Sequence, residues 1–161
     1  MPLIKDSLRT GVSFGLTSAI ITTLGLMVGL YSSTNSKLVV LGGILTIAIA
    51  DAFSDALGIH ISEESEKQHT SVEIWQSTIF TFLAKFIFAL TFIVPVIIFP
   101  ITMAVIVSVV WGILSLSILS FKIAQAKQEN PWSATAEHLF IAVLVIIITN
   151  LVGKGIAKFF N

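Results

Sequence analysis

Long apolar runs make up most of the chain, and short polar stretches separate them. A helix that crosses a bilayer needs roughly 20 mostly apolar residues. Because backbone groups in lipid must hydrogen-bond within their own segment, each run is predicted to be a helix. Five segments qualify: 12–30, 38–62, 74–94, 101–123 and 136–160. The pattern therefore predicts an all-α integral membrane protein with one five-helix domain over residues 1–161, in which short links make neighbouring helices antiparallel. Pro95 and Pro100 are expected to bracket a short bend.

Composition agrees with this fold class and excludes several functions. Hydrophobic residues make up 55% of the chain and charged residues 11%, whereas soluble domains carry about 25% charged residues. The net charge of zero gives no indication of nucleic acid, and the absence of cysteine leaves only oxygen and imidazole ligands for a metal. The chain shows no nucleophile–base constellation and no glycine-rich phosphate loop. We therefore expect neither an enzyme nor a prosthetic group.

Lysine and arginine outside the predicted helices indicate the orientation. With the N-terminus in the cytoplasm, the inner side carries five such residues and the outer side three. The inner set is Lys5, Arg9, Lys67, Lys122 and Lys127, and the outer set is Lys37, Lys154 and Lys158. The N-terminus is thus predicted to be cytoplasmic. The run from Val12 to Leu30 is too long for the apolar region of a signal peptide, so it is expected to stay as a helix. A prokaryotic plasma membrane is the simplest location.

Two aspartates interrupt the second apolar segment. A charged side chain at bilayer depth costs several kcal/mol, so such residues are functional candidates. Asp51 and Asp55 are four residues apart, which places both on one face of a helix, with Ser54 beside them. Carboxylates suit hard or borderline divalent cations, and two close carboxylates raise each other's affinity for protons. A cation or proton site is therefore predicted here.

The alternative for the aspartates is a structural ion pair with Lys85. Lys85 is eleven residues from Ile74, where the third segment begins, and Asp51 is eleven residues from Ser62, where the second ends. At about 1.5 Å per residue both lie roughly 16 Å from the same end, so contact is geometrically easy. The two interpretations can coexist, because Lys85 could act as a counter-charge until a cation or proton arrives.

Further polar residues are candidates for a metal-binding entrance, called the mouth below, and for the lining of a transport path. The mouth would follow the second segment, with imidazole and carboxylate ligands suited to iron(II), manganese or zinc. Its members are His60, Glu63, Glu64 and Glu66. A solvated helix end is the alternative. Ser13 and Thr17 could line a path along the first helix, or bond back to their own backbone. The pairs Gly11/Gly15 and Gly25/Gly29 allow close helix packing, within the chain or across a dimer.

Three stretches resemble the vacuolar iron transporter family. They are GVSFGLTSAIITTLGLMVGL at residues 11–30, ADAFSDALGIHIS at 50–62 and AVLVIIITNLVGKGI at 142–156. The resemblance implies five helices per protomer and a homodimer with its path between the two copies of the first helix. It also implies proton-coupled export of iron(II) and similar cations from the cytoplasm.

The sequence departs from the family pattern at four places. Phe14 stands where the family has an aspartate, Asp55 where it has a methionine and Ile59 where it has a glutamate. The large glutamate-rich domain is reduced to the link around residues 63–73. A carboxylate in place of methionine favours a harder cation such as manganese.

The leading hypothesis is thus a small, dimeric transporter of divalent metal cations, with Asp51 and Asp55 as intramembrane ligands and Lys85 as their counter-charge. Two alternatives stay open. A proton-coupled transporter of a non-metal solute would use the same carboxylates for protons, and a non-transporting scaffold would use the Asp51–Lys85 pair for structure.

Overall fold

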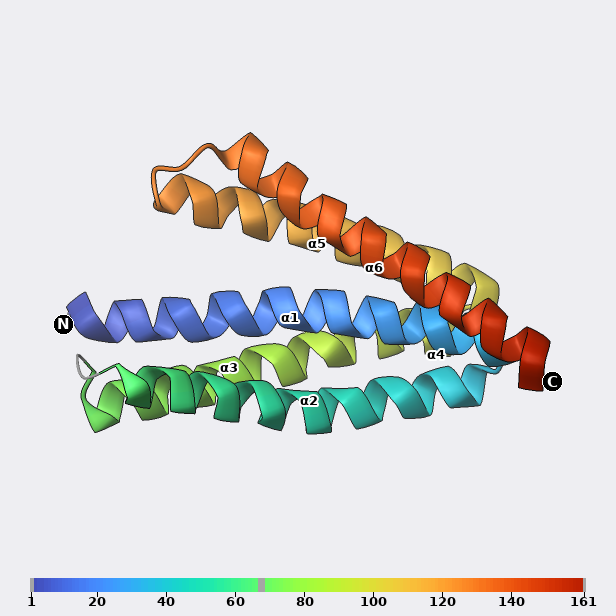
Figure 1. Ribbon diagram of the computed structural model, residues 1–161, viewed down its shortest axis with the longest axis horizontal. Coiled ribbons are helices and arrows are strands. Elements are labelled where there is room, and N and C mark those ends of the chain that lie inside the picture. The colour runs from blue at the N-terminus through green and yellow to red at the C-terminus, as the bar shows by residue number, and fades with distance from the viewer. Residues whose placement is uncertain (1, 67–68, 161) are drawn as a thin grey trace.

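The described part of the chain forms six helices. They make an elongated bundle in which the two termini lie at opposite ends (Figure 1). The computed structural model describes residues 2–66 and 69–160, with side chains from Ser7 onward. The helices are α1 (Pro2–Thr34), α2 (Lys37–Ser65), α3 (Ser71–Thr91), α4 (Ile93–Ile98), α5 (Ile101–Ala126) and α6 (Pro131–Phe160). Lys5 and Lys67, which count toward the predicted orientation, lie outside the residues whose side chains are described.

Five stretches of the described residues are long and apolar enough to span a membrane. They are Ser7–Thr34, Lys37–Ser65, Ser71–Ile98, Ile101–Ala126 and Pro131–Phe160. The prediction of an all-α protein with five such helices is confirmed. The observed helices extend beyond the predicted apolar segments, because helical hydrogen bonding continues into polar residues that hydropathy does not count. The expected bend after Val94 is also different, since Pro95 lies within the short helix α4.

The helix ends follow from local chemistry. Asn35 adopts a left-handed conformation with φ 48° and donates its backbone N–H to Tyr31 O at 2.9 Å, which ends α1. Ser36 then caps α2 by accepting from Val39 N. Thr70 and Glu73 form a capping box at the start of α3. These caps fix the tight connections that bring the helices side by side.

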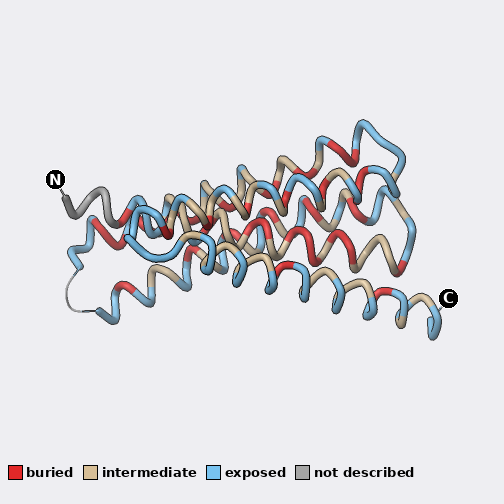
Figure 2. The backbone as a smooth tube through the Cα atoms, turned by 90° about the horizontal axis from the view of Figure 1, so that it is seen from above, coloured by how far each residue is buried: buried red, intermediate tan, exposed pale blue. Residues whose placement is uncertain are grey.

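Helix α1 lies at the centre of the bundle and contacts α2, α3, α5 and α6. Its glycines make two of these contacts close. A Cβ at Gly15 would lie 2.6 Å from Thr81 O on α3, and one at Gly25 would lie 2.9 Å from a methyl group of Val145 on α6. The first-helix glycine pairs therefore serve packing within the chain. Helix α6 is the least enclosed, with only Ala142 and Gly153 buried among its described residues (Figure 2).

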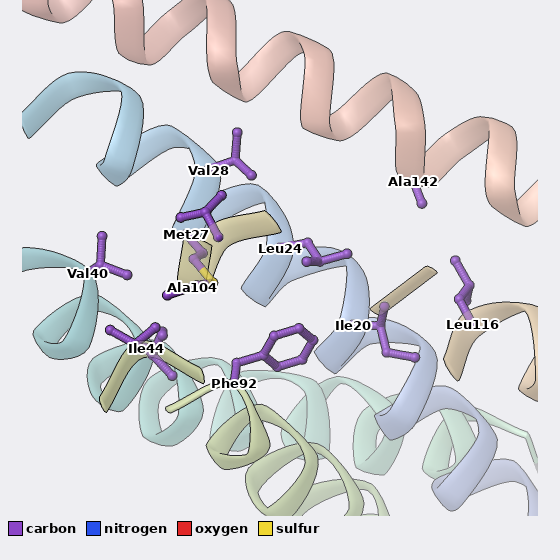
Figure 3. Close-up of a cluster of buried hydrophobic side chains, with 12 residues drawn as sticks. Ile20, Leu24, Met27, Val28, Val40, Ile44, Phe92, Ala104, Leu116 and Ala142 are labelled. Atoms are coloured by element: carbon purple, nitrogen blue, oxygen red, sulfur yellow. The ribbon is translucent and has the colours of Figure 1, made fainter. Parts of the chain in front are cut away.

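The apolar core gathers where α1, α2, α4 and α5 meet. Leu24, Met27, Ile44, Phe92 and Leu116 belong to this cluster, in which Leu116 lies on the side of Ile20 (Figure 3). Nearer the N-terminal end most of the enclosed side chains of α3 are polar: Glu73, Ser77, Thr81 and Lys85 are all buried, beside the apolar Ile74. Burial of polar groups requires compensating partners, so this end of the bundle is where a functional site is expected.

Candidate cation site

Lys85 is the centre of the polar cluster. Its side chain is only 1% exposed, and it extends from α3 toward both aspartates of α2. The ammonium nitrogen lies 2.5 Å from Asp51 Oδ2 and also forms an ion pair with Asp55 Oδ2. It donates a third contact to Ser18 Oγ on α1 at 2.8 Å. An ammonium has three N–H donors, so Lys85 meets three oxygen atoms from two neighbouring helices.

Helix geometry explains why both aspartates meet one lysine. Asp51 and Asp55 lie one turn apart on α2, so their side chains stack along the same face. The contact between Asp51 and Lys85, expected from equal depth, is present. Asp55 shares the ammonium as well, which the depth argument did not foresee. Ser18 completes the cluster because the close contact of α1 with α3 at Gly15 brings the next turn of α1 against Lys85.

The two carboxylates remain partly accessible although Lys85 is enclosed. The side chain of Asp51 is 27% exposed and that of Asp55 is 18% exposed. Asp51 also borders a pocket of about 470 Å³, which is lined by Leu26, Gly43, Thr46, Ile47 and Ala50. One positive charge faces two negative charges in this cluster. An approaching cation would therefore find oxygen ligands and an unbalanced negative charge.

The predicted mouth residues do not gather in the structure. His60 turns into an apolar pocket, where its Nδ1 lies 2.9 Å from Thr78 Oγ1 and its ring meets Trp75 edge-on at 4.8 Å. Glu64 and Glu66 are exposed, and Glu66 Oε2 lies 3.4 Å from His69 Nε2. Within residues 2–66 and 69–160 no three His, Asp or Glu side chains are grouped to hold a metal ion. A metal role for His60, Glu63, Glu64 and Glu66 stays a prediction.

Glu63 differs from its neighbours at the end of α2. Its side chain is buried, and Oε2 has no hydrogen-bond partner among the described residues. Helical spacing explains the difference, because Glu63 continues the buried face of α2 that carries Ala52 and Ala56. The four-residue spacing of the buried positions Val40 to Ala56 would continue to positions 60 and 64, so that pattern alone does not single out Glu63.

The predicted path-lining residues are spread over different surfaces. Ser13 borders a pocket with Arg9 and Lys127, two positively charged side chains. Thr17 is half-buried, whereas Ser54 is exposed on α2. Ser18, one residue beyond Thr17, is the hydroxyl that contacts Lys85. The structure thus brings Asp51, Asp55 and Lys85 together and leaves the three path residues apart from a single lining.

The comparisons with known proteins agree with these observations. No curated protein matches the chain by sequence. The sequence model of the VIT family matches residues 8–74, a range that contains most of α1, all of α2, both aspartates and Ser18. Over residues 8–74, which are less than half of its length, the chain is therefore similar to the VIT family.

Proposed function

We propose that the protein exports divalent metal cations, iron(II) or manganese, from the cytoplasm, with protons moving in the opposite direction. The observation that carries the proposal is the meeting of Asp51, Asp55 and Lys85 inside the bundle. Intramembrane charges are costly and are found mainly on ion pathways. Carboxylate oxygens are ligands that manganese accepts readily and that iron(II) also accepts.

In this proposal the Lys85 ammonium occupies the position at which the transported cation would bind. Its ammonium lies against one oxygen of each carboxylate, where a metal ion would bind. A divalent cation would balance both carboxylate charges, whereas Lys85 balances one. The cargo would enter from the pocket beside Asp51 and displace the ammonium. Protons carried the other way would then offset the charge that the cargo moves.

A homodimer through α1 belongs to the same proposal. The glycine pairs of α1 are covered by α3 and α6 of the same chain. A second copy would therefore have to contact α1 through other residues. An orientation with the N-terminus in the cytoplasm is likewise proposed, from the lysine and arginine distribution. A prokaryotic plasma membrane is proposed with it as the simplest location.

Metal flux into proteoliposomes tests the function. Iron(II), manganese, cobalt and zinc would be supplied with and without a pH gradient, to wild type, Asp55→Asn and Glu129→Gln. Asp55→Asn leaves Lys85 paired with Asp51, so folding should persist while flux falls at least tenfold. Glu129→Gln also replaces a carboxylate by an amide, at an exposed position between α5 and α6, and should keep its flux. Folded wild type that moves none of the four metals would overturn the proposal.

A structural clamp is the second candidate function. The Lys85 ammonium contacts three oxygen atoms on α1 and α2, which is also what a fixed crosslink between helices would require. A clamp predicts that Asp55→Asn lowers stability and that no cation competes with Lys85. Transport of a non-metal solute would instead leave proton-dependent flux that metals do not inhibit.

A further inference from the structure

A second polar pocket lies between the N-terminal part of α1 and the C-terminal part of α5. It has a volume of about 370 Å³ and is lined by Arg9, Thr10, Ser13, Phe14, Ile123 and Lys127. Two of these side chains are positively charged and two carry hydroxyls, and none is acidic. The pocket therefore attracts an anion and repels the cations that Asp51 and Asp55 would bind.

The pocket lies at one end of the membrane-spanning helices. Arg9 is near the start of the first span and Lys127 follows the last residue of the fourth. The hairpin of α5 and α6 diverges from α1 at this end of the bundle (Figure 1). Phe14 is 43% exposed, further along α1 in the direction of the bilayer interior. Charged groups therefore stand at the level of lipid headgroups, with an apolar side chain below them.

The guanidinium of Arg9 can donate hydrogen bonds to a ligand in this pocket. Its Nη2 makes a long hydrogen bond of 3.4 Å to Ile123 O near the end of α5. A guanidinium carries five N–H donors in a planar fork that matches two phosphate oxygens. The bond to Ile123 thus orients Arg9 toward the pocket and leaves donors for a phosphate group. Basic pockets between membrane helices are known to hold anionic lipid headgroups.

We propose that this pocket binds an anionic phospholipid from the leaflet next to the N-terminus. Arg9 and Lys127 contact the phosphate, the hydroxyls of Thr10 and Ser13 contact headgroup oxygens, and an acyl chain runs along Phe14. The bound lipid fills the opening between α1 and the α5–α6 hairpin. This inference does not depend on which cation the protein carries.

The test measures lipid retention and thermal stability of the purified full-length protein. Phosphatidylglycerol or phosphatidylcholine is added in mixed micelles to wild type, Arg9→Gln/Lys127→Gln and Lys122→Gln. Bound lipid is counted by native mass spectrometry. Wild type and Lys122→Gln should retain phosphatidylglycerol and gain several degrees in Tm, and the double variant should lose at least half of both effects. Lys122 is an exposed cation of α5 outside the pocket lining, so it controls for nonspecific attraction.

Three results would overturn the proposal. The first is equal retention and equal stabilisation in wild type and the double variant. The second is stabilisation by inorganic phosphate as strong as by phosphatidylglycerol, because a free anion would then be the ligand. The third is a change of oligomeric state in place of lipid loss, because a second copy would then cover the pocket. If Arg9→Gln does not fold, the lipid retention and Tm of the single variant Lys127→Gln are compared with those of wild type instead.

Discussion

Lys85 on α3 lies 2.5 Å from Oδ2 of Asp51 on α2, and the same ammonium is shared with Asp55 one turn further along. A single buried cation thus holds two intramembrane carboxylates that would otherwise repel each other. Removing the cation and removing either carboxylate are therefore different perturbations, and their effects can be told apart.

Lys85→Gln should destabilise the protein and strengthen its response to metal. Removing one member of a buried ion network typically costs about 3–5 kcal/mol, because unpaired charge stays behind. Added manganese should raise the Tm of Lys85→Gln more than that of wild type, since no ammonium competes for the carboxylates. Thermal unfolding in detergent with a manganese titration measures both effects, with Lys122→Gln as the control. Equal manganese responses in variant and wild type would support the clamp instead.

Asp51 and Asp55 should both contribute to neutralising the charge of Lys85. Asp51→Ala alone leaves Asp55 on the ammonium and should cost less than Asp51→Ala/Asp55→Ala, which leaves a buried lysine without a carboxylate. Adding Lys85→Ala to that double variant should restore part of the lost stability, because no charge then remains. Unfolding free energies of the single, double and triple variants give the coupling. Strict additivity across the set would show that the three charges act independently.

Gly15 on α1 and Gly58 on α2 should respond oppositely to substitution. Gly15→Ala places a Cβ 2.6 Å from a backbone oxygen of α3 and should separate the helices, whereas Gly58→Ala meets nothing within 4 Å. In a helix interior, replacing glycine by alanine adds about 0.5–1 kcal/mol of stability when nothing clashes. Gly58→Ala should therefore be neutral or stabilising, and Gly15→Ala destabilising, in unfolding measured in the same detergent. A Gly15→Ala protein as stable as wild type would contradict the close packing of α1 on α3.

Asn150 should contribute a modest amount to the contact of α6 with α1. Its Nδ2 donates to Ser32 Oγ at 2.7 Å, and hydrogen bonds between membrane helices average about 0.6 kcal/mol. Asn150→Leu should lower the unfolding free energy by about that amount. Ser32→Ala should have the same effect, and the pair of changes should cost no more than one. Additive losses would mean that the two side chains do not act as a pair.

How far the sequence predicts this site depends on the kind of information needed. Depth along a helix follows from the constant rise per residue, which is why contact between Asp51 and Lys85 could be expected. The rotation of one helix about its axis relative to another does not follow from rise. Ser18 was therefore not singled out as the partner of Lys85, and Asp55 was not expected to share it.

The same limit explains the mouth residues and the glycines. His60, Glu63 and Glu64 are close in sequence, but successive residues of a helix point about 100° apart. One of them faces an aromatic pocket, one the bundle interior and one the outside. Small residues at spacing four predicted that α1 approaches another helix closely, and the choice between α3, α6 and a second copy needed the three-dimensional packing.

The central place of α1 has a consequence for biosynthesis. Helix α1 leaves the ribosome before α6, which covers Gly25 and Gly29. During translation this face of α1 stays open to lipid or to other nascent chains until α6 enters the membrane. The bundle cannot close before α6 has been made, so a chain truncated before residue 131 presents an uncovered glycine surface to the quality-control machinery.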